Sequence, residues 1–224
     1  MGPFRQVQVL LFICFESCSA QQVELGRASV TDPTSELQVV VNVYNGVNLP
    51  SSDLARAEQE SEKIFLYAGI RLIWKNGLLS AGVKRDAPIV SSSPASLHLR
   101  IWTRAMVGKT PALPETLGFC LSLENRDAVV LADAIQKRAV FGSTNFDDLL
   151  GLAMAHELGH LLLQSARHSV TGIMRARWTE KGLAEDYRGY LRFTSREAQS
   201  MRNEVRRRMR LKKLGEILTA PHWE

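Results

Sequence analysis

The residues best suited to chemistry in this sequence are two histidines with three residues between them and a glutamate directly after the first. They are His156, Glu157 and His160, in the run His-Glu-Leu-Gly-His. Residues four apart on an α-helix lie on one face, about 6 Å apart along the axis, so both imidazoles can bind one ion. Imidazole is a common ligand of Zn²⁺, and three protein ligands leave a fourth position open for water. The spacing therefore predicts a single catalytic zinc ion.

Glu157 is placed to act as a base in such a site. It follows His156 by about 100° of helix turn, so its carboxylate can lie beside the metal without binding it. Zinc lowers the pKa of a bound water to about 7, and a carboxylate nearby can take the proton as that water attacks a carbonyl carbon. We therefore expect a hydrolase with Glu157 as general base.

Two residues could supply the third ligand. His168 follows in a polar, turn-prone stretch, 164–172, where the chain can fold back beneath the helix. Glu180 could bind instead if a further helix returned it to the metal, as in thermolysin-like enzymes. His98 and His222 are remote in the sequence. We expect His168 to be the ligand.

A nearly all-apolar helix must position the two histidines. Its start is marked by Thr144-Asn145-Phe146-Asp147, which resembles a capping box, and by acidic residues that suit the positive end of the helix dipole. The apolar pattern extends to about Leu163 and covers most of the helix surface, so the helix should be buried between layers. Histidines and a glutamate there would be costly unless a metal or hydrogen bonds satisfied them.

The remaining elements predict a sheet of about five strands with a backing helix. Ser51-Ser52-Asp53 can cap that helix, which is expected to run to about Tyr67, and another amphipathic helix from about Thr194 ends the fold. Residues 124–127 suit the turn of a hairpin at the sheet edge. The β-rich runs are Leu37 to Tyr44, Ile70 to Trp74, Leu97 to Trp102, Gly118 to Leu123 and Ala128 to Ala132.

This order predicts an α+β (α/β) fold with a mixed, twisted sheet and a buried helix that carries the site. The length of 224 residues and the 45% hydrophobic content suit one domain. We expect a linker at 21–36 and one catalytic domain at 37–224, with an upper subdomain at 37–163 and a small lower subdomain at 164–224.

Residues 1–20 are typical of a signal peptide. Arg5 gives a positive start, Val9 to Phe15 form an apolar run too short to span a membrane, and Ser17 to Ala20 offer small residues for cleavage. The protein is then expected to be secreted or periplasmic. Cleavage would leave Cys120 as the last cysteine, so no internal disulfide is expected, and Cys120 should behave as a small buried apolar residue.

Excess positive charge gathers near the end of the chain, where it contributes to a formal net charge of +5. Such runs are usually a solvated helix face, so we expect neither a nucleic-acid partner nor a membrane span. The basic residues are Arg202, Arg206, Arg207, Arg208, Arg210, Lys212 and Lys213.

The run from His156 to Met174 resembles the metzincin clan of zinc peptidases, and within it the matrixin-like branch. The signature of these proteins is His-Glu-x-x-His-x-x-Gly-x-x-His, followed by a turn that contains methionine. The resemblance implies that His156, His160 and His168 bind one Zn²⁺, that Glu157 is the general base and that Met174 forms a hydrophobic floor under the metal.

The sequence departs from that signature at two positions, so the helix must end differently. The family glycine falls at Leu163, and His168 lies two residues later than the family's third histidine. The resemblance further implies a metalloendopeptidase whose edge strand, here Gly118 to Leu123, pairs with an extended peptide or protein substrate. Tyr187 and Tyr190 could assist at the oxyanion, but packing is the expected role.

Three other functions fit parts of the pattern. The chain could be a zinc amidohydrolase acting on a non-peptide substrate, a gluzincin-type peptidase with Glu180 as third ligand, or a non-catalytic secreted zinc-binding protein. Glu157 argues against the last, because structural zinc usually has four protein ligands and the sequence offers no cysteine or fourth histidine nearby. The oligomeric state is left open by the sequence.

Overall fold

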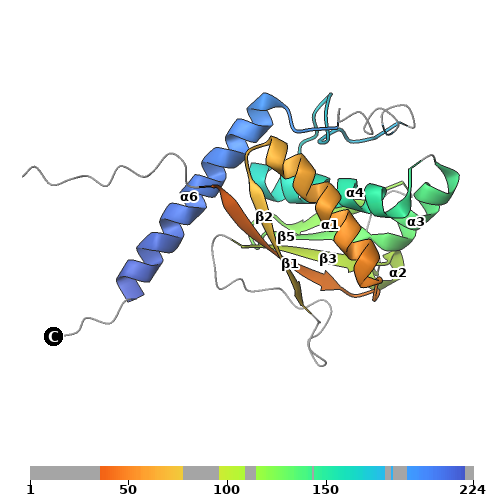
Figure 1. Ribbon diagram of the computed structural model, residues 1–224, viewed down its shortest axis with the longest axis horizontal. Helices are drawn as coiled ribbons and strands as arrows, with labels where there is room; N and C mark the ends of the chain where they lie inside the picture. The colour runs from red at the N-terminus through yellow and green to blue at the C-terminus, as the bar shows by residue number, and fades with distance from the viewer. Residues whose placement is uncertain are drawn as a thin grey trace, which may run out of the picture. The chain divides into compact units, whose positions relative to one another are not determined.

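The computed structural model describes residues 36–77, 96–108, 115–142, 144–179, 183 and 191–219 (Figure 1). A mixed five-stranded sheet with the order β2-β1-β3-β5-β4 forms its frame. Parallel pairing joins β1 to β2 and β3, and β3 to β5, whereas β4 is antiparallel to β5. The strands are β1 (Gln38–Asn45), β2 (Arg71–Gly77), β3 (Ser96–Trp102), β4 (Gly118–Ser122) and β5 (Asp127–Leu131).

Helices α1 and α4 pack against each other beside this sheet, and α4 contacts β3, β4 and β5 (Figure 1). The predicted α+β class, with a mixed sheet, a backing helix and a buried helix, is confirmed. Two further helices, α2 and α3, were not predicted, and α3 begins at Ala132, which the sequence pattern assigned to the end of the preceding strand. The helices are α1 (Ser51–Tyr67), α2 (Arg104–Val107), α3 (Ala132–Phe141), α4 (Phe146–Leu163) and α6 (Ser195–Thr219).

Helix α4 is the centre of the core. Every residue from Leu149 to Leu162 is buried, as the uniformly apolar sequence predicts. Its N-cap residue is Asn145, and Asp147 and Asp148 lie in its first turn near the positive end of the dipole. Across the helix pair, Asp147 forms an ion pair with Arg56 of α1. The helix that carries the candidate ligands is therefore held on several sides.

Helix α6 is joined to the body by both apolar and basic residues. Met201 and Val205 are fully buried, and Arg202 Nη1 donates to the carbonyl of Ala68 at 2.7 Å. Arg208 Nη2 donates to the carbonyl of Leu161 near the end of α4 at 2.9 Å. The prediction that the basic residues form a solvated helix face is therefore wrong for Arg208, which is only 3% exposed. Among the described residues, no helix is long and apolar enough to cross a membrane.

Replacing Gly151 by alanine is expected to lower the free energy of unfolding by about 1–3 kcal/mol, because extra atoms in a packed core force their neighbours apart. A Cβ at Gly151 would lie 2.6 Å from the carbonyl oxygen of Ala57 and 2.7 Å from Cβ of Glu60, both on α1. Urea unfolding would measure the change. Gly77→Ala is a matched control, since the nearest atom to its Cβ is Val43 O at 3.9 Å. Equal stability of the two variants would contradict close packing of α1 on α4.

Candidate active site

Two histidines of α4 have their ring orientation fixed by main-chain carbonyls. Nδ1 of His156 lies 2.8 Å from the carbonyl oxygen of Ile173, and Nδ1 of His160 lies 2.7 Å from that of Ser165. A carbonyl oxygen only accepts hydrogen bonds, so both Nδ1 atoms carry the proton and donate. Each Nε2 is then left with its lone pair.

These two lone pairs face each other, because Nε2 of His156 and Nε2 of His160 are only 3.0 Å apart. Two acceptors at this distance repel unless a positive species lies between them. Tetrahedral zinc with nitrogen ligands at about 2.0–2.1 Å would hold two such atoms about 3.3 Å apart. The residues present therefore fit a metal ion, and their carbonyl partners are the kind that orient metal-binding histidines.

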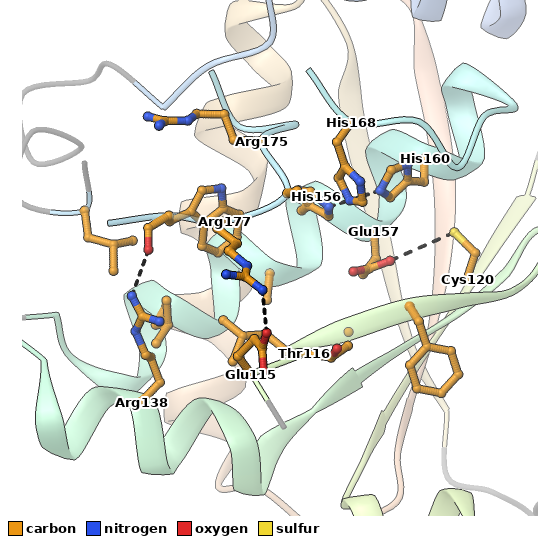
Figure 2. Close-up of a pocket in the computed structure, with 18 of the residues that line it drawn as sticks. Glu115, Thr116, Cys120, Arg138, His156, Glu157, His160, His168, Arg175 and Arg177 are labelled. Atoms are coloured by element: carbon orange, nitrogen blue, oxygen red, sulfur yellow. Dashed lines mark hydrogen bonds and ion pairs between the residues drawn. The ribbon is translucent and has the colours of Figure 1, made fainter. Parts of the chain in front are cut away.

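The third predicted ligand, His168, reaches the same place from the segment after α4. Its ring stacks on His156 with 5.2 Å between centroids and meets His160 edge-on at 4.9 Å. One ligand atom from each of the three histidines can be chosen so that all lie within 4.8 Å of one another. Figure 2 shows the three rings gathered together. The structure thus brings together all three histidines singled out in the sequence.

Burial dominates the electrostatics of the cluster. It lowers the pKa of His156 to about 3, partly offset by the hydrogen bond to the Ile173 carbonyl, and it also lowers the pKa of His160. Both rings are therefore neutral near pH 7, which is the state that binds metal.

Glu157 lies beside the cluster and faces strand β4 (Figure 2). Its side chain is buried, and burial raises its pKa to about 8. The thiol of Cys120 on β4 lies 3.9 Å from Oε2 of Glu157, and burial raises the pKa of that thiol. Cys120 is partly buried, packs against the hydrophobic core and also lines the pocket, so the expected buried apolar role is confirmed in part.

A pocket of about 890 Å³ extends from the histidines along α4. Its charged groups are largely paired, since Arg177 contacts Glu115 at 2.8 Å and Arg138 Nη2 donates to the carbonyl of Trp178 at 2.8 Å. The walls are mainly apolar, which suits a side chain of a substrate. The apolar walls include Leu117, Leu149, Ala153, Trp178 and Leu183.

Trp178 is a site residue that sequence reasoning missed. Its Nε1 donates to the carbonyl of Ile173 at 3.1 Å, the same oxygen that accepts from His156. Its ring meets His156 edge-on, with 5.6 Å between centroids. No periodic pattern or motif marked this tryptophan, because it lies in an irregular segment.

Met174 is fully buried, and its Sδ lies against α4 at Gly159, the residue before His160. A Cβ on Gly159 would lie 2.7 Å from Met174 Sδ and 2.7 Å from Cε1 of Phe193. Glycine at this position therefore lets both side chains approach the helix. The role of Met174 as a floor under a metal stays a prediction.

The end of α4 differs from the family pattern, as the departures in the sequence predicted. The helix runs to Leu163, and Gln164 takes the left-handed conformation with φ 50° and ψ 39°. Its Nε2 donates to the carbonyl of Leu161 at 2.6 Å, which satisfies one of the last helix carbonyls. The turn therefore occurs one residue later than the family glycine would place it, and without a glycine.

Of the other candidate residues, the structure describes only His98, which lies outside the three-histidine cluster. His98 is buried on β3, where its Nδ1 lies 3.3 Å from the hydroxyl of Tyr44. Glu180, the alternative third ligand, lies outside the described residues, as do Tyr187, Tyr190 and His222.

Gly118→Ala is expected to displace Glu157 from its place beside the histidines and to lower any hydrolytic activity that uses this carboxylate. A Cβ at Gly118 would lie 2.8 Å from Oε1 and 2.8 Å from Cγ of Glu157, and 2.7 Å from the carbonyl oxygen of Val129. A shift of about 1 Å in a catalytic group can cost on the order of 10²-fold in rate. The measurement is kcat with zinc content, with the exposed neighbour Leu121→Ala as control. Unchanged kcat in Gly118→Ala would show that Glu157 tolerates the added carbon.

No family model and no curated protein matches this sequence. Among solved structures, the chain is similar to a zinc-dependent peptidase from Methanocorpusculum labreanum, with 12% identity and a TM-score of 0.44 over 72% of this chain and 99% of that chain. It is also similar to archaemetzincin from Methanopyrus kandleri, with 15% identity and a TM-score of 0.45 over 77% of this chain and 98% of that chain. Both scores are low, so the functional conclusion depends on the residues of the site itself.

Proposed function

We propose that this protein is a zinc-dependent metalloendopeptidase in which His156, His160 and His168 hold one Zn²⁺ and Glu157 is the general base. The observation that carries the proposal is the pair of Nε2 atoms 3.0 Å apart, each on a ring whose Nδ1 donates to a carbonyl. With a third imidazole beside them, the donor set matches a catalytic zinc site, which has three protein ligands.

The bound Zn²⁺ would supply Lewis-acid activation of water and of the substrate carbonyl. Burial alone favours the protonated form of Glu157, but a Zn²⁺ ion held beside it would favour the carboxylate. In that form Glu157 would take the proton of the attacking water and return it to the leaving nitrogen. The carboxylate is suited to this because it lies beside the histidines, in a pocket wall, with only 5% of its surface exposed. A proton held there is shielded from bulk water.

The position of β4 favours a peptide over a small amide as substrate. Within the described sheet, β4 is the last strand and pairs with β5 on one side. Its residues Gly118 to Cys120 also line the pocket. An extended peptide could therefore add to the free edge by main-chain hydrogen bonds and cross the site. We further propose that residues 1–20 direct export to the periplasm or the outside of the cell.

Metal analysis combined with cleavage of an unfolded protein tests this function. One Zn²⁺ per chain is expected, together with cleavage that a chelator stops and added zinc restores. Zinc binding without cleavage of any peptide would contradict the endopeptidase. Cleavage confined to small non-peptide amides would instead favour the amidohydrolase alternative.

A further inference from the structure

His168 differs from the other two histidines in how its ring is held. His156 and His160 lie on a buried helix, and each has a carbonyl partner for Nδ1. His168 is exposed, lies outside any helix or strand, and within the described part of the chain receives no hydrogen bond to its ring. Apart from its ring contacts with His156 and His160, its position is set by the backbone on either side.

The next residue, Ser169, is fixed in two ways. Its backbone N–H donates to the carbonyl of Met174 at 2.8 Å, which closes the turn over 169–174. Its hydroxyl donates to Oε1 of Glu197, which belongs to the first turn of α6. The side chain thus connects the segment of the third candidate ligand to a distant helix.

Glu197 is itself held rigidly. Its Oε2 accepts from the backbone N–H of Thr194 at 2.7 Å, and the Thr194 hydroxyl accepts from the backbone N–H of Glu197 at 3.3 Å. This reciprocal pair is a capping box at the start of α6. Glu197 is only 9% exposed, and α6 is anchored to α4 by Arg208. The carboxylate therefore offers Ser169 a fixed partner.

The residues just before α6 hold the turn over 169–174 at a second point. The backbone N–H of Ile173 donates to the carbonyl of Arg192 at 3.0 Å. Between the two connections, Gly172 has φ 73°, and a Cβ there would lie 2.3 Å from the Arg192 oxygen. The turn is therefore pressed closely against the residues that precede α6, and the Ser169 contact fixes the end nearest to His168.

We propose that Ser169 and Glu197 form a positioning pair that holds His168 against His156 and His160 and thereby strengthens zinc binding. This inference rests on the proposed function, because it assumes that the metal binds at the three histidines. Neither member of the pair belongs to the three-histidine cluster that would hold the metal. Groups that orient a metal ligand commonly change the affinity for the metal 10–100-fold.

The test compares Ser169→Ala with Ser169→Thr in the full-length protein. Zinc affinity would be measured by competition with a chelator, and ligand geometry by the visible spectrum of the Co²⁺-loaded protein. Ser169→Ala is expected to weaken zinc binding about 10–100-fold and to alter the Co²⁺ spectrum. Ser169→Thr keeps the hydroxyl and is expected to remain near the unchanged protein. Arg167→Ala removes an exposed side chain on the other side of His168 and serves as the matched control.

A double-mutant cycle identifies the partner. Glu197→Gln keeps a residue that suits the capping box but removes one of the two carboxylate acceptors. If the pair acts as a unit, Ser169→Ala combined with Glu197→Gln should weaken zinc binding less than the product of the two single effects. Strictly multiplicative effects would overturn the pairing. If metal-free Ser169→Ala does not fold, Glu197→Gln alone carries the affinity and Co²⁺ measurements.

The outcomes separate the two proposals. If the unchanged protein binds no zinc, the proposed function is overturned and the positioning pair with it. If the unchanged protein binds zinc and Ser169→Ala binds it equally well with the same Co²⁺ spectrum, only the positioning pair is overturned.

Discussion

Glu157→Gln is expected to lower kcat for peptide cleavage by roughly 10²–10⁴-fold, the usual contribution of a general base, and to leave one Zn²⁺ per chain. Glutamine has nearly the same shape as glutamate but cannot take up a proton, so the wall between α4 and β4 should remain intact. Steady-state kinetics and metal analysis on the same preparation would measure both quantities.

Glu124→Gln is the matched control for this substitution, because Glu124 is exposed in the turn between β4 and β5. Its kcat should equal that of the unchanged protein. Retained cleavage in Glu157→Gln would remove the general base from the proposed mechanism. Loss of zinc together with activity would instead make Glu157 a metal ligand or a structural residue.

His168→Ala is expected to reduce zinc affinity by more than the 10–100-fold typical of groups that only orient a ligand. The variant would leave two donors, His156 and His160, where a catalytic site needs three. Equilibrium competition with a chelator measures the change. Because His168 is exposed, the metal-free variant should unfold at the same urea concentration as the unchanged protein, which separates lost binding from lost folding.

Glu180→Ala tests the alternative third ligand and is compared directly with His168→Ala. If His168 is the third ligand, Glu180→Ala should keep the zinc affinity of the unchanged protein. Lost affinity in Glu180→Ala with retained affinity in His168→Ala would assign the site to the gluzincin-type arrangement.

The elements that carry strong local patterns could be predicted from the sequence. The run up to Leu163 is apolar at almost every position and has acidic residues at its start, and it forms the buried α4. The five short apolar runs identified in the sequence form the five strands, of which β1 and β5 are rich in valine, and the predicted edge hairpin is β4 paired with β5. Helix α3 was missed because it begins at Ala132 directly after a strand, with no glycine, proline or capping residue to mark the change.

The site residues likewise fall into a group that local spacing predicts and a group that it does not. His156, Glu157 and His160 follow from helical spacing alone, since the distance between them is set within one turn. The partners that orient them do not. The Ile173 carbonyl and Trp178 reach the site through an irregular segment, and Glu197 reaches it from the first turn of α6; long-range contacts decide the course of both. No local pattern in the sequence encodes those contacts.

The two carbonyls that fix the proton positions of His156 and His160 both come from residues later in the chain than α4. During synthesis, the histidines therefore leave the ribosome before the groups that set their tautomers. In a nascent chain that ends at α4, the Nδ1 atoms of His156 and His160 would lack the carbonyl acceptors that fix their tautomers. Under the proposed function, the fully oriented set of ligands therefore exists only after the chain beyond α4 has folded back onto the helix.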